Sequence, residues 1–313
     1  LLGLNLHPHK LIGMFSKTVW VALISSIVFA VIGYGFGAAF GYSPMTSLVI
    51  GLGIMFSSTI IGLKLLPTTV LHHQHTGEVM ISILLLQDLI AIVVLLVLQA
   101  MSSGHLSLMQ ISFLIVGFPI LLILAYLAQR FVLIKLFAKF DRVHEYIFLV
   151  SIGWCLSLAL LAEVMGLSAD IGAFIAGVAL AAHPVSQYIS ENLKPLRDFF
   201  LVIFFFAIGA QFDLHYLPEI FIPAILLAVV MMVLKPVVFR FLIHQVKETK
   251  QVSWEVGWRL GQASEFTLLV AYLASGSGLI SAQASSLLQA ATILTFIVSS
   301  YVVVLRFPSP LAF

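Results

Sequence analysis

The chain has 313 residues, of which 61% are hydrophobic and only 9% are charged, and its net charge is +2. Soluble globular domains carry about 25% charged residues, so this composition, with a mean hydropathy of +1.15, excludes a soluble domain. The single cysteine, Cys155, excludes a disulfide framework. Because long apolar segments in lipid satisfy their own backbone groups only as helices, the sequence predicts an all-α polytopic membrane protein.

The chain opens with LLGLNLHPHKL (1–11), which contains neither Met nor a charged leader. We interpret this stretch as the end of a helix and expect the sequence to be a fragment. Ten apolar segments follow, with no linker or charge block between them, so we predict one transmembrane domain over residues 1–313. The segments are 18–42, 45–66, 78–100, 107–134, 144–164, 167–184, 197–211, 216–244, 255–276 and 281–306.

Lysine and arginine are concentrated on one predicted side of these segments. The loops near residues 43, 103, 165, 214 and 279 contain none of them. Cytoplasmic loops collect Lys and Arg, so we predict that the basic side is cytoplasmic and that the C-terminus lies there. The 13 basic residues on that side, out of 15, are Lys10, Lys17, Lys64, Arg130, Lys135, Lys139, Arg142, Lys194, Arg197, Arg240, Lys247, Lys250 and Arg306.

Asp88 lies in the middle of the segment 78–100, within LLLQDLIAI (84–92). A charge at the bilayer centre costs about 2.5–3.5 kcal/mol on insertion scales, so such residues normally face a cavity or the interior of a helix bundle. We expect this carboxylate to bind a cation when ionised and to release it when protonated, with Gln87 adding a neutral oxygen. The alternative is a structural carboxylate that is only hydrogen-bonded, or paired with Lys235 to hold two helices together.

Lys235 is the matching basic residue, in VMMVLKPVVF (230–239). Two readings remain open for it. It pairs with Asp88 when no ion is bound, or it extends its ammonium group to the cytoplasmic side. Pro236 removes a backbone donor, which indicates a broken helix near a cavity.

Two segments carry small and polar residues where a spanning helix would prefer leucine, GLGIMFSSTIIG (51–62) and GWRLGQASEFTLL (257–269). Transporters built from inverted repeats unwind one helix in each half near the membrane midplane, where free carbonyls coordinate cations. The alternative is close helix packing through small residues. Under the first reading the residues that line the breaks are Ser57, Ser58 and Thr59 in one segment and Gln262, Ser264 and Glu265 in the other.

Six motifs then occur in the order known for one transporter family: 3–11, 56–66, 84–92, 166–181, 204–214 and 261–266. They are similar to its GLEL-P-L, SST crossover, LLFQDI, GLS-x-x-x-GAF-x-AG, FF-x-x-G-x-x-x-D and Q-G-x-EF patterns. By these motifs the chain resembles the membrane domain of the monovalent cation:proton antiporter family 2, and within it the Kef-type potassium efflux group. Two positions depart from the patterns, Asn5, where Glu is usual, and Asp170.

The resemblance implies an antiporter fold with inverted repeats and two crossing discontinuous helices. It implies exchange of a monovalent cation, K⁺ or Na⁺, for H⁺ by alternating access. Asp88 would carry the ion and the proton, Thr59, Gln87 and Ser58 would assist, and Lys235 matches the membrane lysine of the family. One acid at Gln87–Asp88, where many sodium/proton relatives have two, leads us to expect 1:1 exchange.

The resemblance also implies a homodimer in the inner (plasma) membrane. By the same resemblance we expect the sequence to be a fragment that lacks the first two or three spans of the family and any C-terminal cytoplasmic regulatory domain. Lipid is the expected surrounding partner, and we expect no enzymatic activity, cofactor, metal centre or nucleic-acid partner. Three other functions are compatible with the sequence. One is a ligand-gated potassium efflux system with channel-like behaviour, although a TVGYG-type filter is absent. The others are an intramembrane aspartyl protease that uses Asp88 and Glu265, and a non-transporting membrane sensor.

Overall fold

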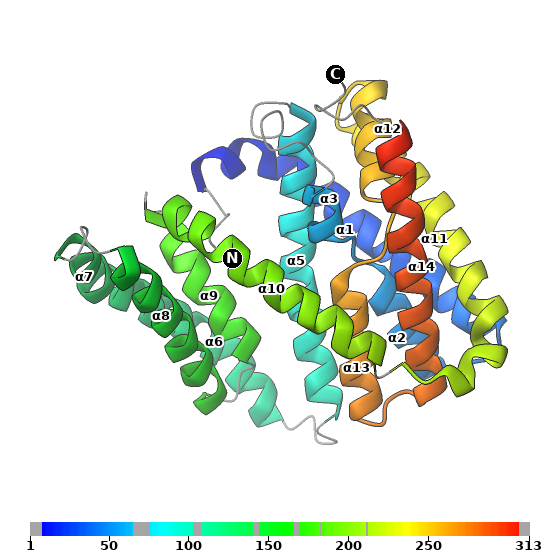
Figure 1. Cartoon of the computed structure of the whole chain (residues 1–313), viewed down its shortest axis with the longest axis horizontal. Coiled ribbons are helices and arrows are strands. Elements are labelled where there is room, and N and C mark those ends of the chain that lie inside the picture. The colour runs from blue at the N-terminus through cyan, green and yellow to red at the C-terminus, as the bar shows by residue number, and fades with distance from the viewer. Residues whose placement is uncertain are drawn as a thin grey trace. The chain divides into compact units, whose positions relative to one another are not determined.

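The computed structural model describes the backbone of residues 8–64, 75–102, 108–139, 144–165, 169–181, 183, 185–210 and 212–306 (Figure 1). Throughout these residues the chain forms helices and no strand. The chain divides into two compact units, one made of Leu1–Ile12 with Ser103–Ala210 and the other of Gly13–Ser102 with Gln211–Phe313. The all-α fold is therefore confirmed.

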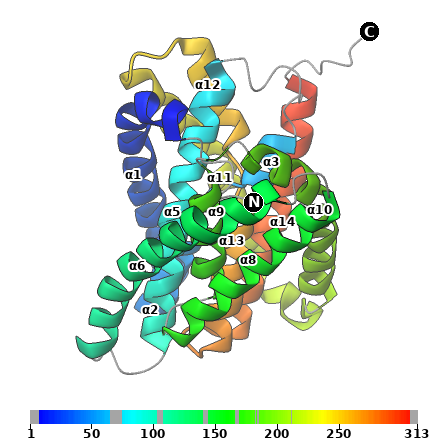
Figure 2. The ribbon, with the colours of Figure 1, turned by 90° about the vertical axis from the view of Figure 1, so that its left-hand side faces the viewer.

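The first unit contains α6 (Leu108–Ala128), a π-helical turn (Gln129–Leu133), α7 (Ile134–Lys139), α8 (His144–Val164), α9 (Ala169–Ala181) and α10 (Val185–Ala210). Figure 2 shows α8 and α9 side by side. Their backbones approach closely because Gly172 has no Cβ, which would meet the Leu158 carbonyl. The Trp154 indole N–H donates to the Ala176 carbonyl oxygen at 3.1 Å and fixes the same contact.

The second unit contains α1 (Pro8–Ala39, from Gly13 onward), α2 (Pro44–Ile54), α3 (Thr59–Lys64), α5 (His75–Ser102), α11 (Leu217–Gln245), α12 (Lys250–Arg259), α13 (Glu265–Gly276) and α14 (Ala282–Arg306). A short 3-10 turn, Leu214–Tyr216, precedes α11. All the helices except α3 contribute buried apolar side chains to one core. Gly33 and Gly51 lie against each other between α1 and α2, as expected for small residues at a helix contact.

Five helical stretches in the described residues are long and apolar enough to cross a membrane: Thr18–Ala39, Pro119–Phe137, Glu145–Val164, Leu214–Gln245 and Ala282–Arg306. Shorter apolar helices cover Pro44–Ile54, Val79–Leu95, Gly172–Ala181 and Glu265–Gly276. With the overall composition these helices identify a multi-pass membrane protein.

Three expectations need correction. The predicted segment 197–211 is the apolar second half of α10, which begins twelve residues earlier at Val185, because its first half is amphipathic and buries Ile189 in the core of the first unit. The helix expected over 18–42 already begins at Pro8. Pro236 does not break its helix: α11 runs continuously from Leu217 to Gln245, and the proline ring packs near Gly261 instead.

Candidate functional site

The first helix break separates α2 from α3 over residues 55–58. Two hydroxyl groups satisfy the helix ends on either side of it. The Thr267 hydroxyl donates to the Gly53 carbonyl oxygen at 2.7 Å, near the end of α2. The Ser58 hydroxyl accepts from the Ile61 N–H at 3.1 Å and caps the start of α3. The expected interruption of the segment 45–66 is thus present, and its backbone groups have side-chain partners.

The second break separates α12 from α13 over residues 260–264. Ser264 caps α13 by accepting from the Phe266 N–H at 3.2 Å, while the Thr267 hydroxyl accepts from the Ser264 N–H at 3.2 Å. This reciprocal arrangement is a capping box. Farther along the chain, the Thr295 hydroxyl of α14 accepts from the Ala263 N–H at 3.0 Å. The second expected interruption is also present.

The two breaks touch each other directly. The Ser57 hydroxyl donates to the Leu260 carbonyl oxygen at 2.7 Å. The amide of Gln262 donates to the Ser58 carbonyl oxygen at 3.4 Å, and its own oxygen accepts from the Ser299 hydroxyl at 3.0 Å. All of these groups are buried. Segments about 200 residues apart therefore form one polar centre inside an apolar bundle.

Asp88 borders this centre from α5. Its side chain is only 1% exposed, and the Thr59 hydroxyl lies 3.3 Å from each of its two carboxylate oxygens. Thr59 is the first residue of α3, so the carboxylate lies at the positive end of that short helix. The sequence-predicted pair Thr59 and Asp88 is brought together.

Gln87 faces the same centre, but its side-chain oxygen binds the backbone of the first break, whereas we expected it to be a ligand for a cation. Its side-chain oxygen accepts from the Ser57 N–H at 3.0 Å, so it holds the first break. The amide nitrogen of Gln87 is fully buried and has no hydrogen-bond partner among the described residues. An unpaired buried donor of this kind costs about 1–3 kcal/mol.

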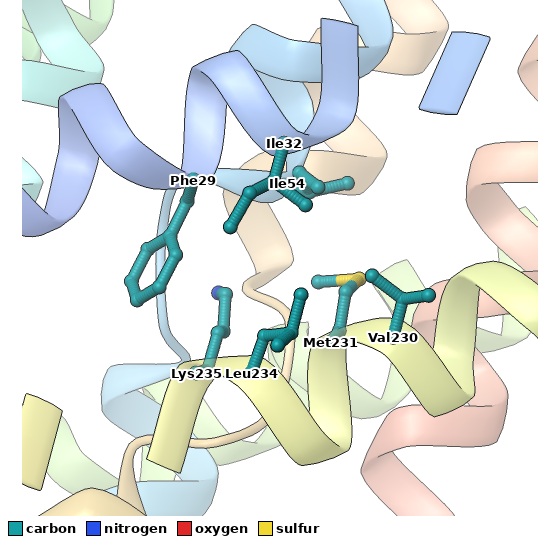
Figure 3. Close-up of a pocket in the computed structure, with 7 residues that line it drawn as sticks. All are labelled: Phe29, Ile32, Ile54, Val230, Met231, Leu234 and Lys235. Carbon is teal, nitrogen blue, oxygen red and sulfur yellow. The ribbon is translucent and has the colours of Figure 1, made fainter. Parts of the chain in front are cut away.

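Lys235 lies on α11 with its ammonium between the two breaks. The ammonium donates to the Phe56 carbonyl oxygen at 2.5 Å and to the Gln262 carbonyl oxygen at 3.2 Å, and the residue is 1% exposed. It also lies 5.1 Å from the centroid of the Phe29 ring, toward which it points in Figure 3. The rest of this small pocket is apolar, lined by Ile32, Ile54, Val230, Met231 and Leu234.

Both expectations for Lys235 are therefore wrong within the described part of the chain. The ammonium neither pairs with Asp88 nor extends to the cytoplasmic side. Unwound backbone offers carbonyl oxygens that point out of the helices, and two of these lie within reach of the lysine. Both carbonyls follow the C-terminal ends of helices, α2 and α12, where a cation is favoured.

Glu265 is the second carboxylate at the polar centre. It is the first residue of α13, and its carboxylate acts electrostatically on Asp88. The Ser264 hydroxyl donates to it at 3.3 Å. Arg259, by contrast, is paired with Glu255 one turn earlier on α12, at 3.0 Å. The centre thus places two carboxylates at helix N-termini and one ammonium at two helix C-termini.

This arrangement suits a monovalent cation or a proton better than a transition metal. Among the described residues no group of three His, Cys, Asp or Glu side chains could hold a metal ion. The available donors are carboxylate, hydroxyl and main-chain oxygens, which are hard ligands. Residues 1–7, which contain Asn5 and the first part of the motif at 3–11, and the side chain of Asp170 lie outside the described residues.

Sequence reasoning missed three hydroxyl residues, Thr267, Thr295 and Ser299, which hold the breaks from α13 and α14. Thr295 and Ser299 lie in TILTFIVSS (292–300), a stretch that we had interpreted only as an apolar span. Their spacing of four residues puts both on one helix face. Two hydroxyl residues four positions apart in an apolar helix indicate a polar stripe that faces other buried polar groups.

Comparisons with known proteins identify the family of this chain. The family model described as "Sodium/hydrogen exchanger, transmembrane" matches residues 1–305. Among curated relatives, "Ammonium/H(+) antiporter subunit AmhT" of Alkalihalophilus pseudofirmus is 31% identical over 76% of this chain and 62% of its own length. "K(+) efflux antiporter 4" of Arabidopsis thaliana is 27% identical over 80% and 43%. "Iron transporter MagA" of Paramagnetospirillum magneticum is 24% identical over 83% and 60%.

The chain spans about half the length of the curated relatives it matches. The matched family consists of transporters rather than enzymes, which removes the protease reading of Asp88 and Glu265. A match over nearly the whole chain decides the family. The chain belongs to the sodium/hydrogen exchanger transmembrane family.

Proposed function

We propose that the protein exchanges a monovalent cation, K⁺ or Na⁺, for protons across the membrane. The observation that carries this proposal is the position of Asp88. Its carboxylate is buried on α5, touches the first residue of α3, and lies beside two broken helices. A carboxylate in this setting holds either a cation or a proton, but not both.

In the proposed cycle, alternating access exposes Asp88 to one side of the membrane at a time. The cation binds the ionised carboxylate together with the hydroxyl of Thr59. Protonation of Asp88 on the other side releases it. Lys235 stays on the carbonyl oxygens of Phe56 and Gln262 and balances the helix C-termini, so Asp88 is not neutralised by a fixed ion pair.

The names of the relatives support cation exchange as a class. They include potassium, ammonium and unspecified cation antiporters, which is why we propose a monovalent cation. We also propose that the side rich in Lys and Arg, including the end of α14, faces the cytoplasm. One carboxylate at Gln87–Asp88 supports electroneutral 1:1 exchange.

The test uses everted membrane vesicles of cells that express the full-length protein, with a fluorescent pH dye. We expect K⁺ or Na⁺ to alkalinise wild-type vesicles and Asp88→Asn to abolish the response. Glu191→Gln is the matched acid-to-amide control, because Glu191 is exposed on α10 and contacts only Gln187 among the groups described. Normal exchange by Asp88→Asn would refute the proposal. Movement of K⁺ without protons in wild type would favour the efflux-pathway alternative, and a clear current on a solid-supported membrane would contradict 1:1 exchange.

A further inference from the structure

A cluster of two arginines and two tryptophans lies on α11, α12 and α14, away from the ion site. The guanidinium of Arg240 lies 4.3 Å from the centroid of the Trp254 ring, and that of Arg306 lies 5.3 Å from the centroid of the Trp258 ring. The two indoles stack on each other, with centroids 6.3 Å apart and an angle of 20° between the ring planes. The four side chains form one continuous basic and aromatic surface, which we call the Arg–Trp cluster.

The arginines in this cluster have no carboxylate partner in the described part of the chain. Glu255, which shares α12 with the two tryptophans, is paired with Arg259 at 3.0 Å. A guanidinium that stacks by its face keeps its in-plane N–H groups free to donate, and these match the geometry of a phosphate. Arg306 is exposed and Arg240 is half-buried, so both can be reached from outside the bundle.

The position of the cluster indicates which phosphate it meets. Figure 1 shows α12 at the same end of its unit as the C-terminal end of α14, the end that the distribution of Lys and Arg assigns to the cytoplasm. Tryptophan is enriched at membrane interfaces, and basic pockets between helices on the cytoplasmic side bind anionic lipid head groups. Exposed apolar side chains continue toward the membrane on the same helices, with Val237 on α11 and Tyr301 on α14.

We propose that the Arg–Trp cluster binds the phosphate of an anionic phospholipid from the cytoplasmic leaflet. Each arginine offers its in-plane N–H groups to a lipid phosphate, and the indoles fix the guanidinium groups and border the acyl chains. The site goes beyond cation exchange and does not depend on which ion is carried.

Binding here has a route to the transport centre, because α12 is the helix that ends at the second break. Gly257 of α12 lies directly against the Pro236 carbonyl. At the far end of α12, the Leu260 carbonyl oxygen accepts the hydroxyl of Ser57. A lipid that fixes α11, α12 and α14 together therefore fixes one wall of the centre.

The test measures quenching of tryptophan fluorescence by brominated lipids. The full-length protein carrying Trp20→Phe and Trp154→Phe, which keeps Trp254 and Trp258 of the four tryptophans in this chain, is reconstituted in phosphatidylcholine. Brominated phosphatidylglycerol or brominated phosphatidylcholine is then titrated in. We expect phosphatidylglycerol to bind about fivefold more tightly for each arginine involved. Arg240→Gln with Arg306→Gln should remove this preference.

The matched control is Lys247→Asn, in the turn between α11 and α12. Lys247 is exposed on the same side and has a positive φ of 68°, which asparagine tolerates. It should lower the preference by no more than about fivefold, the value of one basic residue near the membrane surface, whereas the double arginine variant should lower it by about 25-fold. An equal loss in Lys247→Asn, or no preference in the parent, overturns the site.

Two further measurements complete the test. Soluble glycerol phosphate that displaces brominated phosphatidylglycerol would show a free-phosphate site and overturn the lipid assignment. Native mass spectrometry of the protein with all four tryptophans counts retained phosphatidylglycerol. Fewer bound molecules in the double arginine variant than in wild type is the expected result, and equal numbers contradict the proposal even where the tryptophan variants fail to fold.

Discussion

Replacing Gly257 with alanine should separate two helices that touch backbone to backbone. A Cβ at this position would lie 2.7 Å from the Pro236 carbonyl oxygen, about 0.7 Å short of the 3.4 Å at which ordinary contact begins. The contacted atoms belong to the main chain of a proline inside α11, so they cannot move aside as a flexible side chain would. Overpacking of this kind costs up to about 3 kcal/mol, while the gain in helix propensity from Gly to Ala returns about 1 kcal/mol.

The net loss for Gly257→Ala is therefore about 2 kcal/mol, which corresponds to a fall in Tm of about 3 °C for a chain of 313 residues. Thermal unfolding in detergent, followed by size-exclusion chromatography of heated samples, measures it. Gly35→Ala is the matched control, because a Cβ at Gly35 meets nothing within 4 Å on the exposed face of α1, and its Tm should be equal to wild type or higher. If Gly257→Ala is as stable as Gly35→Ala, α11 and α12 are not in the described contact.

Two other substitutions test the hydroxyl groups of the centre. Thr267→Val should lower the free energy of unfolding by about 2 kcal/mol, since the Gly53 carbonyl and the Ser264 N–H would both lose a buried partner. Thr267→Ser keeps the hydroxyl and should have a Tm close to that of wild type. An unchanged Tm in the valine variant would contradict the two hydrogen bonds of the Thr267 hydroxyl. Thr59→Val should weaken cation-dependent alkalinisation by about tenfold or more, because a hydrogen bond to a charged group is worth roughly 1.5–3 kcal/mol. Thr59→Ser should stay near wild type in the same vesicle assay, and equal activity of the two variants would show that the hydroxyl plays no part.

Much of the fold follows from the sequence because hydropathy and helix length determine most of it. The segments 144–164 and 281–306 agree with α8 and α14 to within a residue. The first half of α10 lies outside the predicted segment because it is apolar on one face only. Length and hydropathy alone say nothing of such an amphipathic start.

In the candidate site, the positions of the helix breaks could be predicted from the sequence, but the partners of Lys235 could not. Gly, Ser and Thr in the segments 51–62 and 257–269 correctly predicted where the helices break, because these residue types weaken a helix locally. The partner of Lys235 could not be predicted in this way. Its two carbonyl oxygens belong to residues 56 and 262, and a backbone acceptor has no sequence signature. Only the packed structure brings a lysine on α11 to both of them.

The ammonium of Lys235 also imposes an order on synthesis and insertion. The Phe56 carbonyl must wait for a partner that is made 179 residues later, which at about 5–20 residues per second takes roughly ten to forty seconds. Gln87, only 30 residues beyond Ser57, protects the neighbouring amide much sooner. During this interval the first break lies in the membrane with an unpaired carbonyl, which costs several kcal/mol in hydrocarbon. The nascent chain therefore needs water or the insertion machinery around α2 and α3 until α11 has been inserted. The later helices of the unit then stabilise the first break.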